Sequence, residues 1–344
     1  MPLSNYYDLS VDLAGKSILV TGGTGSFGKR FVQTVLDRYE PRRLIIFSRD
    51  ELKQFEMEQA FSRAEHPCLR YFIGDVRDRE RLQMAMRDVD YVIHAAALKH
   101  VPLAEYNPTE CIRTNVLGAE NVVQAAFHCG VRKVIALSTD KAANPINLYG
   151  ASKLASDKIF VAANNLSGKT GTRFAVVRYG NVVGSRGSVI PFFQRLKREG
   201  ADTLPITDER MTRFWITLQQ GVDFVLSCLK IARGGEIFVP KIPSMRMTDL
   251  AASLAPGIPM RTVGIRPGEK LHEVMITADD ARSTVELKDR FVIRPAFKFW
   301  GDDDGDTDPE IEGTPVPEGF VFSSDVNDNW LDEAGLDRML KELA

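Results

Sequence analysis

A glycine-rich turn between an apolar strand and an amphipathic helix most constrains what this chain can fold into. The strand is predicted at Ser17–Val20, and glycines follow at positions 22, 25 and 28 in a G-x-x-G-x-x-G pattern. The helix then carries apolar residues at helical spacing from Phe31 to Leu36. Glycine lets a backbone turn sharply and approach a pyrophosphate, which the N–H groups of a helix N-terminus bind. We therefore predict a dinucleotide site at the start of a β-α fold.

The alternation of apolar strand and amphipathic helix repeats through the first half of the chain. Five further strands are predicted at Leu44–Phe47, Arg70–Ile73, Tyr91–His94, Arg132–Leu137 and Phe174–Tyr179. Unbroken apolar runs of this kind are typical of parallel strands that are buried on both faces. The order predicts an α/β fold of the Rossmann type, a doubly wound parallel sheet with helices on both faces.

The end of the second predicted strand, Ser48-Arg49-Asp50, indicates which dinucleotide binds. In dinucleotide folds an acidic residue here accepts from the ribose hydroxyls of NAD, whereas an arginine suits the extra phosphate of NADP. Ser48 and Arg49 therefore predict NADP, and Lys53 one turn later would add positive charge. Asp50 is less consistent with NADP and is also a good N-cap for the next helix. The alternative is that Arg49 is an ordinary surface arginine.

Further cofactor contacts are expected along the carboxyl edge of the sheet. Asp75 either accepts from the adenine amino group or ends the third strand in a turn. Ala95-Ala96-Ala97 leave room for a flat cofactor, whereas His94 is expected in the core. Asn115 lies in a long helix predicted at Asn107–Cys129, and its amide is expected to face the cofactor. The predicted cofactor-binding residues are Gly22, Thr24, Gly25, Ser26, Phe27, Gly28, Ser48, Arg49, Asp50, Lys53, Asp75, Val76, Ala95, Ala96, Ala97, Lys99, Asn115, Tyr149 and Lys153.

A polar stretch, Ser138-Thr139-Asp140-Lys141, follows the fifth strand, and Tyr149 and Lys153 open the next helix. Residues four apart lie on one helix face, so the Tyr149 phenol and the Lys153 ammonium are expected side by side. The cation is expected to lower the pKa of the phenol, so that tyrosinate accepts a proton near neutral pH. An acid, an amine and a phenol are thus predicted to meet at one small substrate. The alternative makes Tyr149 an ordinary helix residue and Lys153 a solvated charge.

After about residue 185 the regular alternation ends. We expect a helix around Phe192, another at Leu218–Ala232, a strand at Glu236–Pro240 and a helix from Met247. We predict an NADP-binding domain at residues 1–185 with returning segments from about 215–242, and a smaller carboxyl-terminal substrate-binding cap at residues 186–300. Residues 301–344 are predicted as an acidic loop and a terminal helix, Asn329–Leu343. The loop lacks the pattern of a calcium site.

The composition argues against several classes of function. Hydrophobic residues make up 44% of the 344 residues and the formal net charge is −2, so nucleic acid and anionic membranes are not expected partners. No apolar run approaches the ~20 residues of a membrane helix. Residues 1–8 do not resemble a signal peptide. The four cysteines show no Cys-x-x-Cys spacing, which fits a reducing cytoplasm, and the histidines show no metal-ligand spacing.

Taken together, the glycine pattern, the Tyr149-x-x-x-Lys153 pair and the cap resemble the extended short-chain dehydrogenase/reductase family over about residues 15–295. Within it the chain is similar to the inverting UDP-N-acetylglucosamine 4,6-dehydratases. The similar segments are Thr21–Gly28, Ser48–Glu51, Ala95–Pro102, Ser138–Lys153, Arg178–Ser188 and Arg266–Glu273. Retaining sugar-nucleotide dehydratases also resemble it, but carry Asp-Glu where this chain has Asp140-Lys141. Relatives with amino-terminal membrane helices differ from it.

The resemblance implies a reaction and a role for each catalytic residue. UDP-N-acetylglucosamine would be oxidised at carbon 4, lose water and be reduced at carbon 6, as the first step toward pseudaminic acid on flagella and other surface glycans. Tyr149, with Thr139 and Lys153, would take the 4-hydroxyl proton. Lys141 would remove the carbon 5 proton, its pKa lowered by burial near the nicotinamide and Lys153. Asp140 would stay protonated and protonate the leaving 6-hydroxyl.

The resemblance also implies substrate contacts and partners. Arg213 and Arg266 are candidates for the substrate diphosphate, since guanidinium pairs with phosphate bidentately; either would equally suit a surface ion pair. The predicted substrate-binding residues are Lys99, Lys141, Tyr179, Asn181, Val189, Arg213, Arg266 and Glu269. A cytoplasmic homo-oligomer built from dimers, with a hexamer as one form, is expected.

Two other functions remain open from the sequence. A sugar-nucleotide 4-epimerase on the same scaffold needs only the phenol and the cofactor, so Asp140 and Lys141 would have no task. A non-catalytic NADP-binding sensor would keep the glycine loop without the catalytic pair. Fold alone does not decide among these functions.

Overall fold

A computed structural model of the chain describes Tyr6 and residues 11–167, 171–185, 187–297 and 311–342. The acidic loop predicted at residues 301–309 lies outside these ranges. None of the helices within them combines the length and apolar character that spanning a membrane requires.

The described residues include a ten-stranded sheet with the spatial order β16-β14-β15-β10-β6-β5-β4-β1-β2-β3. The strands from β3 to β10 run parallel, and β15, β14 and β16 extend the sheet antiparallel. The parallel strands are β1 (Ser17–Thr21), β2 (Arg43–Ser48), β3 (Leu69–Ile73), β4 (Tyr91–His94), β5 (Lys133–Thr139), β6 (Arg173–Tyr179) and β10 (Ile237–Pro240). The antiparallel strands are β14 (Thr284–Glu286), β15 (Arg290–Ile293) and β16 (Thr314–Pro315). The predicted Rossmann-type sheet is confirmed.

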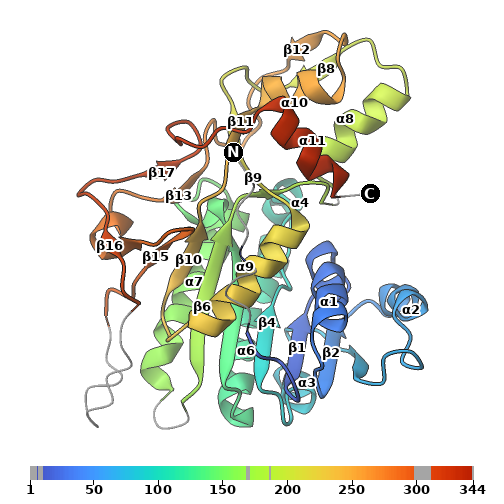
Figure 1. Cartoon of the computed structure of the whole chain (residues 1–344), viewed down its shortest axis with the longest axis vertical. Coiled ribbons are helices and arrows are strands. Elements are labelled where there is room, and N and C mark those ends of the chain that lie inside the picture. The colour runs from blue at the N-terminus through green and yellow to red at the C-terminus, as the bar shows by residue number, and fades with distance from the viewer. Residues whose placement is uncertain (1–5, 7–10, 168–170, 186, 298–310, 343–344) are drawn as a thin grey trace.

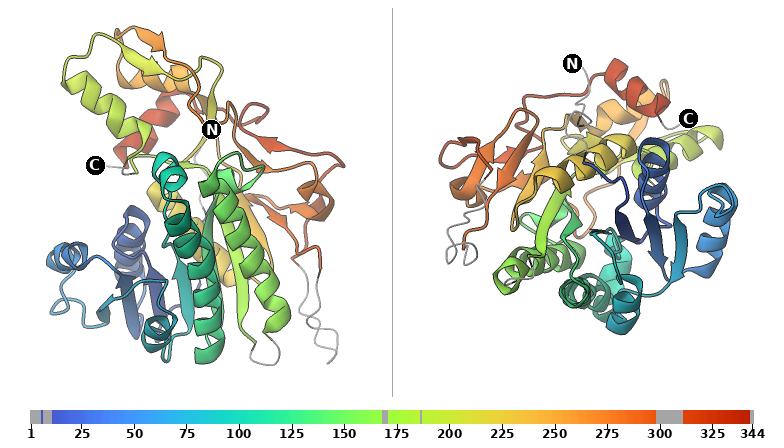
Figure 2. Two further views of the ribbon diagram at one scale, coloured as in Figure 1. Left: turned by 180° about the vertical axis from the view of Figure 1, so that it is seen from behind. Right: turned by 60° about the horizontal axis from the view of Figure 1, so that its bottom comes forward.

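Helices cover both faces of this sheet, which explains why every residue of β1 is buried (Figures 1 and 2). On one face α1 (Ser26–Arg38) packs against α9 (Leu218–Ile231). On the other face α6 (Gly118–Cys129) lies between α3 (Arg79–Ala85) and α7 (Leu148–Ala163). The chain reverses its direction along the sheet between β1 and β4, and ligands of open α/β sheets bind at such a point.

The long helix predicted at Asn107–Cys129 is divided in the structure. Helix α4 (Val101–Tyr106) comes first, followed by α5 (Pro108–Ile112), a π-helical turn η2 (Arg113–Leu117) and α6. Short π-helical insertions in α-helices often occur at functional sites. Here the turn carries Asn115, whose contacts are described below.

A second, smaller hydrophobic core lies over the carboxyl ends of the parallel strands, at the top of Figure 1. It includes buried residues of α8 (Val189–Arg198), β8 (Leu204–Ile206), β9 (Thr212–Ile216), α10 (Met247–Leu254) and α11 (Glu333–Lys341). The other short strands are β7 (Asn181–Val182), β11 (Ser244–Arg246), β12 (Met260–Thr262), β13 (Val274–Ile276) and β17 (Phe322–Ser323); the buried residues of β13 and β17 belong to the large core. The remaining helix, α2 (Glu51–Ala60), lies beside β3.

The terminal helix is shorter than predicted because its N-cap lies later in the chain. The cap is Asp332, whose side chain accepts from Gly335 N, so α11 begins at Glu333 rather than near Asn329. Leu336 and Met339 are fully buried in the smaller core, and α11 packs against α10. The terminal helix therefore packs on the smaller core of its own chain.

Candidate active site

The glycine loop is shaped by contacts that exclude side chains. Gly22 has φ +65°, and a Cβ there would lie 2.9 Å from Ala96 Cα; a Cβ on Gly28 would lie 2.3 Å from Gly23 O. The N-cap of α1 is Gly25, which offers no side-chain cap, and the first turn carries no acidic residue. Ser26 and Phe27 lie in this turn, and Thr24 precedes the N-cap. Backbone N–H groups and the helix dipole at this N-terminus therefore suit an anion such as a phosphate.

The end of β2 carries a mixture of polar contacts. The Ser48 and Thr24 hydroxyls are 2.8 Å apart. Asp50 caps α2 by accepting from Lys53 N, and the two side chains also form a 2.7 Å ion pair, so the capping alternative is confirmed. The Arg49 side chain is 55% exposed, and its Nη1 lies 3.6 Å from Asp75 Oδ2. Arg49 is therefore the cation of this strand end that is open to a ligand.

The residues after β3 and β4 mainly contact the protein itself. Asp75 accepts from the Arg77 side chain at 2.8 Å. Burial raises the pKa of Asp75, but Arg77 outweighs it and the net pKa is lowered. Val76 is buried beside Gly118. The N–H groups of Ala95 and Ala96 donate to Thr21 Oγ1, which holds the backbone leading to Ala97 against the glycine loop.

The side-chain amide of Asn115 was predicted to face the cofactor, but in the structure it forms hydrogen bonds within the protein. It is 1% exposed, its Oδ1 accepts from Leu98 N, and its Nδ2 donates to Leu98 O and to Ser152 Oγ. These bonds tie the loop after β4 to α7, the helix that carries Tyr149 and Lys153. Asn115 therefore positions the loop through buried protein contacts.

His94 is a core residue, as expected. It is 2% exposed, and its Nδ1 lies 2.9 Å from Thr21 Oγ1. Burial, aided by the charge of Lys153, lowers the pKa of His94 to about 3. The imidazole is therefore neutral at physiological pH and supports the same Thr21 hydroxyl that holds the loop after β4.

The polar stretch after β5 forms a buried cluster. Lys141 Nζ lies 3.0 Å from Asp140 Oδ1, and Thr139 Oγ1 donates to the same carboxylate oxygen at 2.8 Å. Asp140 is fully buried, and its Oδ2 has no hydrogen-bond partner among the described residues. Asn181 Oδ1, after β6, lies 3.5 Å from the amine. An acid and an amine therefore meet at the carboxyl end of β5, as predicted.

Sequence reasoning missed the second carboxylate at this amine. Glu273, just before β13, is 2% exposed, and its Oε1 lies 3.2 Å from Lys141 Nζ. It is more than 130 residues away along the chain. The one signal that pointed to it was its place at the end of the similar segment Arg266–Glu273.

The pKa values of Lys141 and Tyr149 were both predicted to be lowered, and without a bound ligand both predictions are wrong. Burial opposes a charge on Lys141, but the carboxylates of Asp140 and Glu273 outweigh it, so the pKa of Lys141 is raised. Burial raises the pKa of Tyr149 to about 12, although Lys141 and a hydrogen bond with Thr139 oppose the rise. Burial lowers the pKa of Lys153, while Asp157 opposes that change. The charge that acts on the Tyr149 phenol is therefore chiefly that of Lys141.

The predicted substrate residues fall into two groups. Tyr179 lies near the cluster: burial raises its pKa, and Tyr149 adds to the rise. Burial and the charge of Lys141 lower the pKa of Lys99. Val189 begins α8 at the edge of the smaller core. Tyr179, Lys99 and Asn181 therefore approach the Asp140–Lys141 pair from separate elements, whereas Val189 is placed only at the smaller core.

The second group comprises Arg213, Arg266 and Glu269. Arg213 is 7% exposed, and its guanidinium donates to the carbonyl oxygens of Thr212, Leu271 and Lys270. It is thus a structural residue in this conformation, and the prediction that it is free for a diphosphate is wrong here. Arg266 is exposed, and its N–H donates to Glu269 Oε2 at 3.4 Å. Arg266 therefore remains the open cation of the pair.

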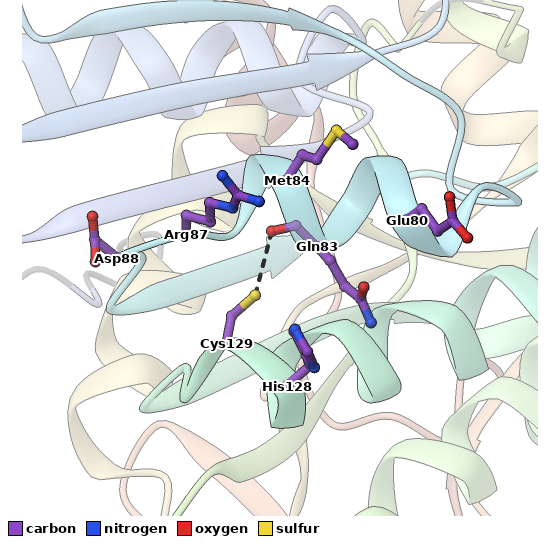
Figure 3. Close-up of a pocket in the computed structure, with 7 residues that line it drawn as sticks. All are labelled: Glu80, Gln83, Met84, Arg87, Asp88, His128 and Cys129. Carbon is purple, nitrogen blue, oxygen red and sulfur yellow. Dashed lines mark hydrogen bonds between the residues drawn. The ribbon is translucent and has the colours of Figure 1, made fainter.

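A hollow of about 470 Å³ between α3 and α6 lies apart from these residues (Figure 3). Its lining residues are Glu80, Gln83, Met84, Arg87, Asp88, His128 and Cys129. Cys129 ends α6 shortly before β5 begins, so the hollow is at the edge where the strands start. It contains none of the predicted site residues.

Comparison with known proteins agrees with this arrangement. A family model described as polysaccharide biosynthesis protein matches residues 18–295. The inverting UDP-N-acetylglucosamine 4,6-dehydratase of Campylobacter jejuni is 61% identical over 326 residues, covering 93% of this chain and 96% of that protein. A UDP-glucose 4-epimerase of Rickettsia akari is 44% identical over 280 residues, covering 79% of this chain and 81% of that protein.

Solved structures share the fold over most of the chain. Pen from Bacillus thuringiensis is 35% identical with a TM-score of 0.85, covering 96% of this chain and 100% of that one. The dTDP-glucose 4,6-dehydratase DesIV from Streptomyces venezuelae, solved with NAD bound, is 26% identical with a TM-score of 0.68, covering 82% of this chain and 93% of that one. The chain therefore belongs to the polysaccharide biosynthesis protein family, as a Rossmann-fold relative of the inverting UDP-N-acetylglucosamine 4,6-dehydratases.

Proposed function

We propose that this chain is a UDP-N-acetylglucosamine 4,6-dehydratase that inverts carbon 5 of the sugar. The observation that carries the proposal is the Lys141 amine, held 3.0 Å from the Asp140 carboxylate at the carboxyl end of β5. Loss of water from a 4-ketosugar needs a base at carbon 5 and an acid at the 6-hydroxyl, and this pair offers both. The 61% identity with the Campylobacter jejuni dehydratase supports the same reaction.

The glycine loop and the end of β2 fit a dinucleotide cofactor. Cβ atoms at Gly22 and Gly28 would collide with backbone, so the loop keeps its close approach only with glycine. The exposed Arg49 favours NADP over NAD, because a guanidinium pairs well with a 2′-phosphate. When bound, the nicotinamide would accept a hydride from carbon 4 and return it at carbon 6, so that the reaction is redox neutral.

Tyr149 would accept the proton of the substrate's 4-hydroxyl. Its phenol is hydrogen-bonded to Thr139, which would contact the same hydroxyl. Because burial raises the phenol's pKa to about 12, the proton transfer needs positive charge close by. That value already includes the charge of Lys141, so the further charge would come from Lys153, one turn along α7.

The Asp140–Lys141 ion pair must become an acid and an amine before water can leave. One proton transfer from Lys141 Nζ to Asp140 Oδ1, across 3.0 Å, produces both groups without changing the net charge of the buried cluster. Neutral Lys141 then removes the carbon 5 proton, and Asp140 protonates the departing 6-hydroxyl, so water leaves. The pair thereby returns to ammonium and carboxylate. Carbon 5 then takes a proton derived from solvent on the opposite face, which inverts the configuration, and the proton that Tyr149 accepted is released to solvent, so that the protons balance.

Product analysis in deuterated water tests this function. The purified protein is incubated with NADP and UDP-N-acetylglucosamine, and the product is examined by mass spectrometry and NMR. We expect a product lighter by one water, with deuterium at carbon 5 and inverted configuration there. A product of unchanged mass would contradict the proposal.

A UDP-sugar 4-epimerase is the second candidate, because the Rickettsia akari epimerase is 44% identical. That reaction leaves the mass of the sugar unchanged and gives carbon 5 no reason to exchange. The two buried carboxylates around Lys141 would then have no chemical task. The cluster therefore favours the dehydratase.

We further infer the setting in which the reaction takes place. The product would be the first intermediate toward pseudaminic acid, for flagellin and other surface glycans, made in the cytoplasm; all four cysteines are unpaired. Exposed apolar side chains lie on the segment from α4 to η2, which supports assembly of a homo-oligomer through this surface; they are Leu103, Tyr106, Ile112 and Leu117.

Arg266 is proposed to bind the UDP diphosphate.

A further inference from the structure

The backbone of Glu273 is held by hydrogen bonds at both its N–H and its carbonyl group. Its N–H donates to Ser324 Oγ at 2.9 Å, and its carbonyl accepts from Ser324 N at 2.8 Å and from Ser323 Oγ. The side chain is buried and reaches Lys141 Nζ at 3.2 Å. A carboxylate held this firmly restricts where the lysine amine can lie.

The other two cations near Glu273, Arg213 and Lys270, donate their hydrogen bonds to backbone carbonyl groups. Arg213 Nε lies 3.8 Å from Glu273, but its guanidinium donates to three backbone carbonyl groups. Lys270 Nζ also lies 3.8 Å away and donates to Ala143 O. Glu273 Oε2 has no hydrogen-bond partner among the described residues. Lys141 is therefore the cation closest to this carboxylate.

The groups that act on Lys141 come from several elements. Asp140 contributes the carboxylate from its own turn, and Glu273 contributes one from the start of β13. Positive charges come from Arg213 on β9, Lys270 beside Glu273 and Lys99 after β4. Asn181 and Tyr149 are the neutral polar neighbours. Removing one of the two carboxylates leaves the remaining cations to favour a neutral amine.

We propose that Glu273 is a positioning residue that holds the Lys141 amine opposite Asp140 and sets the pH at which this amine becomes a base. The chemical role of the amine rests on the proposed function. When Asp140 has taken the proton, Glu273 Oε1, 3.2 Å away, and Asn181 Oδ1, 3.5 Å away, would accept from the two remaining N–H groups. The lone pair at first faces the new Asp140 hydroxyl, and it becomes available for the carbon 5 proton when that hydroxyl turns to the departing 6-hydroxyl.

Competitive labelling of the NADP-loaded enzyme with acetic anhydride tests the proposal without using the reaction. The labelled fraction of the Lys141 peptide is measured by mass spectrometry across pH. We expect the midpoint for Lys141 in Glu273→Gln to lie about one pH unit or more below that of the wild type. Glu199→Gln is the matched control: it makes the same substitution at a well-exposed glutamate that pairs with Arg195, so the midpoint for Lys141 should be unchanged. An unchanged midpoint in Glu273→Gln would overturn the proposal.

Glu273→Asp provides a second measurement if the glutamine variant does not fold. The shorter side chain keeps the charge but withdraws it from the amine, so the midpoint should fall by a smaller amount. A midpoint equal to that of the wild type would count against the proposal.

The pH profile of carbon 5 deuterium exchange separates this proposal from the proposed function. The rising limb of the profile should move to lower pH in Glu273→Gln together with the labelling midpoint. A shifted midpoint with an unshifted limb would support the placement of Glu273 and overturn the base role of Lys141. A purely structural role would lower the rate and leave the position of the limb unchanged.

Discussion

The glycine loop and the Lys141 cluster lie at the same edge of the sheet but are assembled over different distances along the chain. The loop, its strand and its helix occupy residues 17–38. The cluster combines Asp140 and Lys141 with Asn181 and Glu273, from elements up to 133 residues apart. Local steric limits define the loop, whereas balanced buried charges define the cluster.

This difference shows which properties follow from local sequence. At the loop, a positive φ and the nearby Ala96 backbone explain Gly22, and the nearby Gly23 carbonyl group explains Gly28. At the cluster, the protonation of Lys141 depends on the carboxylates of Asp140 and Glu273. Glu273 is distant in sequence, so the residues around Lys141 do not predict its contact. Substitutions should therefore affect cofactor binding and chemistry separately.

Lys141→Ala should have the largest effect and should confine it to the cluster. General acid–base groups typically contribute about 10²–10⁴-fold, so we expect exchange at carbon 5 to fall roughly a thousandfold. NADP affinity should stay at the wild-type value, because Lys141 is not among the residues expected to bind the cofactor. Deuterium incorporation by NMR and NADP titration by fluorescence provide the two readouts. Unimpaired exchange would remove Lys141 from the base role.

The sheet and the central residues could be predicted from the sequence, but the charge balance could not. Apolar strand runs and the glycine spacing locate β1 to β6, and position after β5 brings Asp140 and Lys141 together. The pKa of Lys141 was predicted in the wrong direction, because the carboxylates of Asp140 and of Glu273, which reaches the amine through tertiary structure, together outweigh burial. Arg213 was misassigned for the same reason: its carbonyl partners lie in residues 270–271 as well as beside it.

Gly22→Ala should have the next largest effect, at the loop. A positive φ costs a non-glycine residue about 1–2 kcal/mol of folding free energy. Gly130→Ala is the matched control, because its φ is +66° and a Cβ there meets nothing within 4 Å. Gly22→Ala should lose more stability than Gly130→Ala in urea unfolding, because its Cβ also meets the Ala96 backbone, and only Gly22→Ala should bind NADP much more weakly, roughly a hundredfold. Equal affinities in the two variants would contradict the close approach to Ala96.

The neutral His94 beneath the loop predicts how stability depends on pH. Its pKa is about 3 when folded and about 6.5 when unfolded. Between these values the unfolded chain binds a proton that the folded chain does not, so stability is lost as pH falls below about 6.5. The expected loss from this group is about 2 kcal/mol at pH 5. Urea unfolding at pH 5, 6 and 7 measures it.

His94→Asn should flatten this pH dependence, whatever its effect on stability at pH 7. His128→Asn removes an exposed histidine and should keep the wild-type slope. The same slope in His94→Asn as in the wild type would show that other groups carry the dependence.

Arg49→Ala should have the smallest effect and tests whether the loop side can be interpreted from local sequence. Hydrogen bonds to charged groups contribute about 1.5–3 kcal/mol, so NADP affinity should fall about tenfold or more, with little change for NAD. Stability should hardly change, because exposed ion pairs such as Arg49–Asp75 contribute little. Arg63→Ala, another exposed arginine in an ion pair, should change neither affinity. Equal losses for NADP and NAD would mean that Arg49 does not contact the 2′-phosphate, and cofactor choice would then depend, like the protonation of Lys141, on residues distant in sequence.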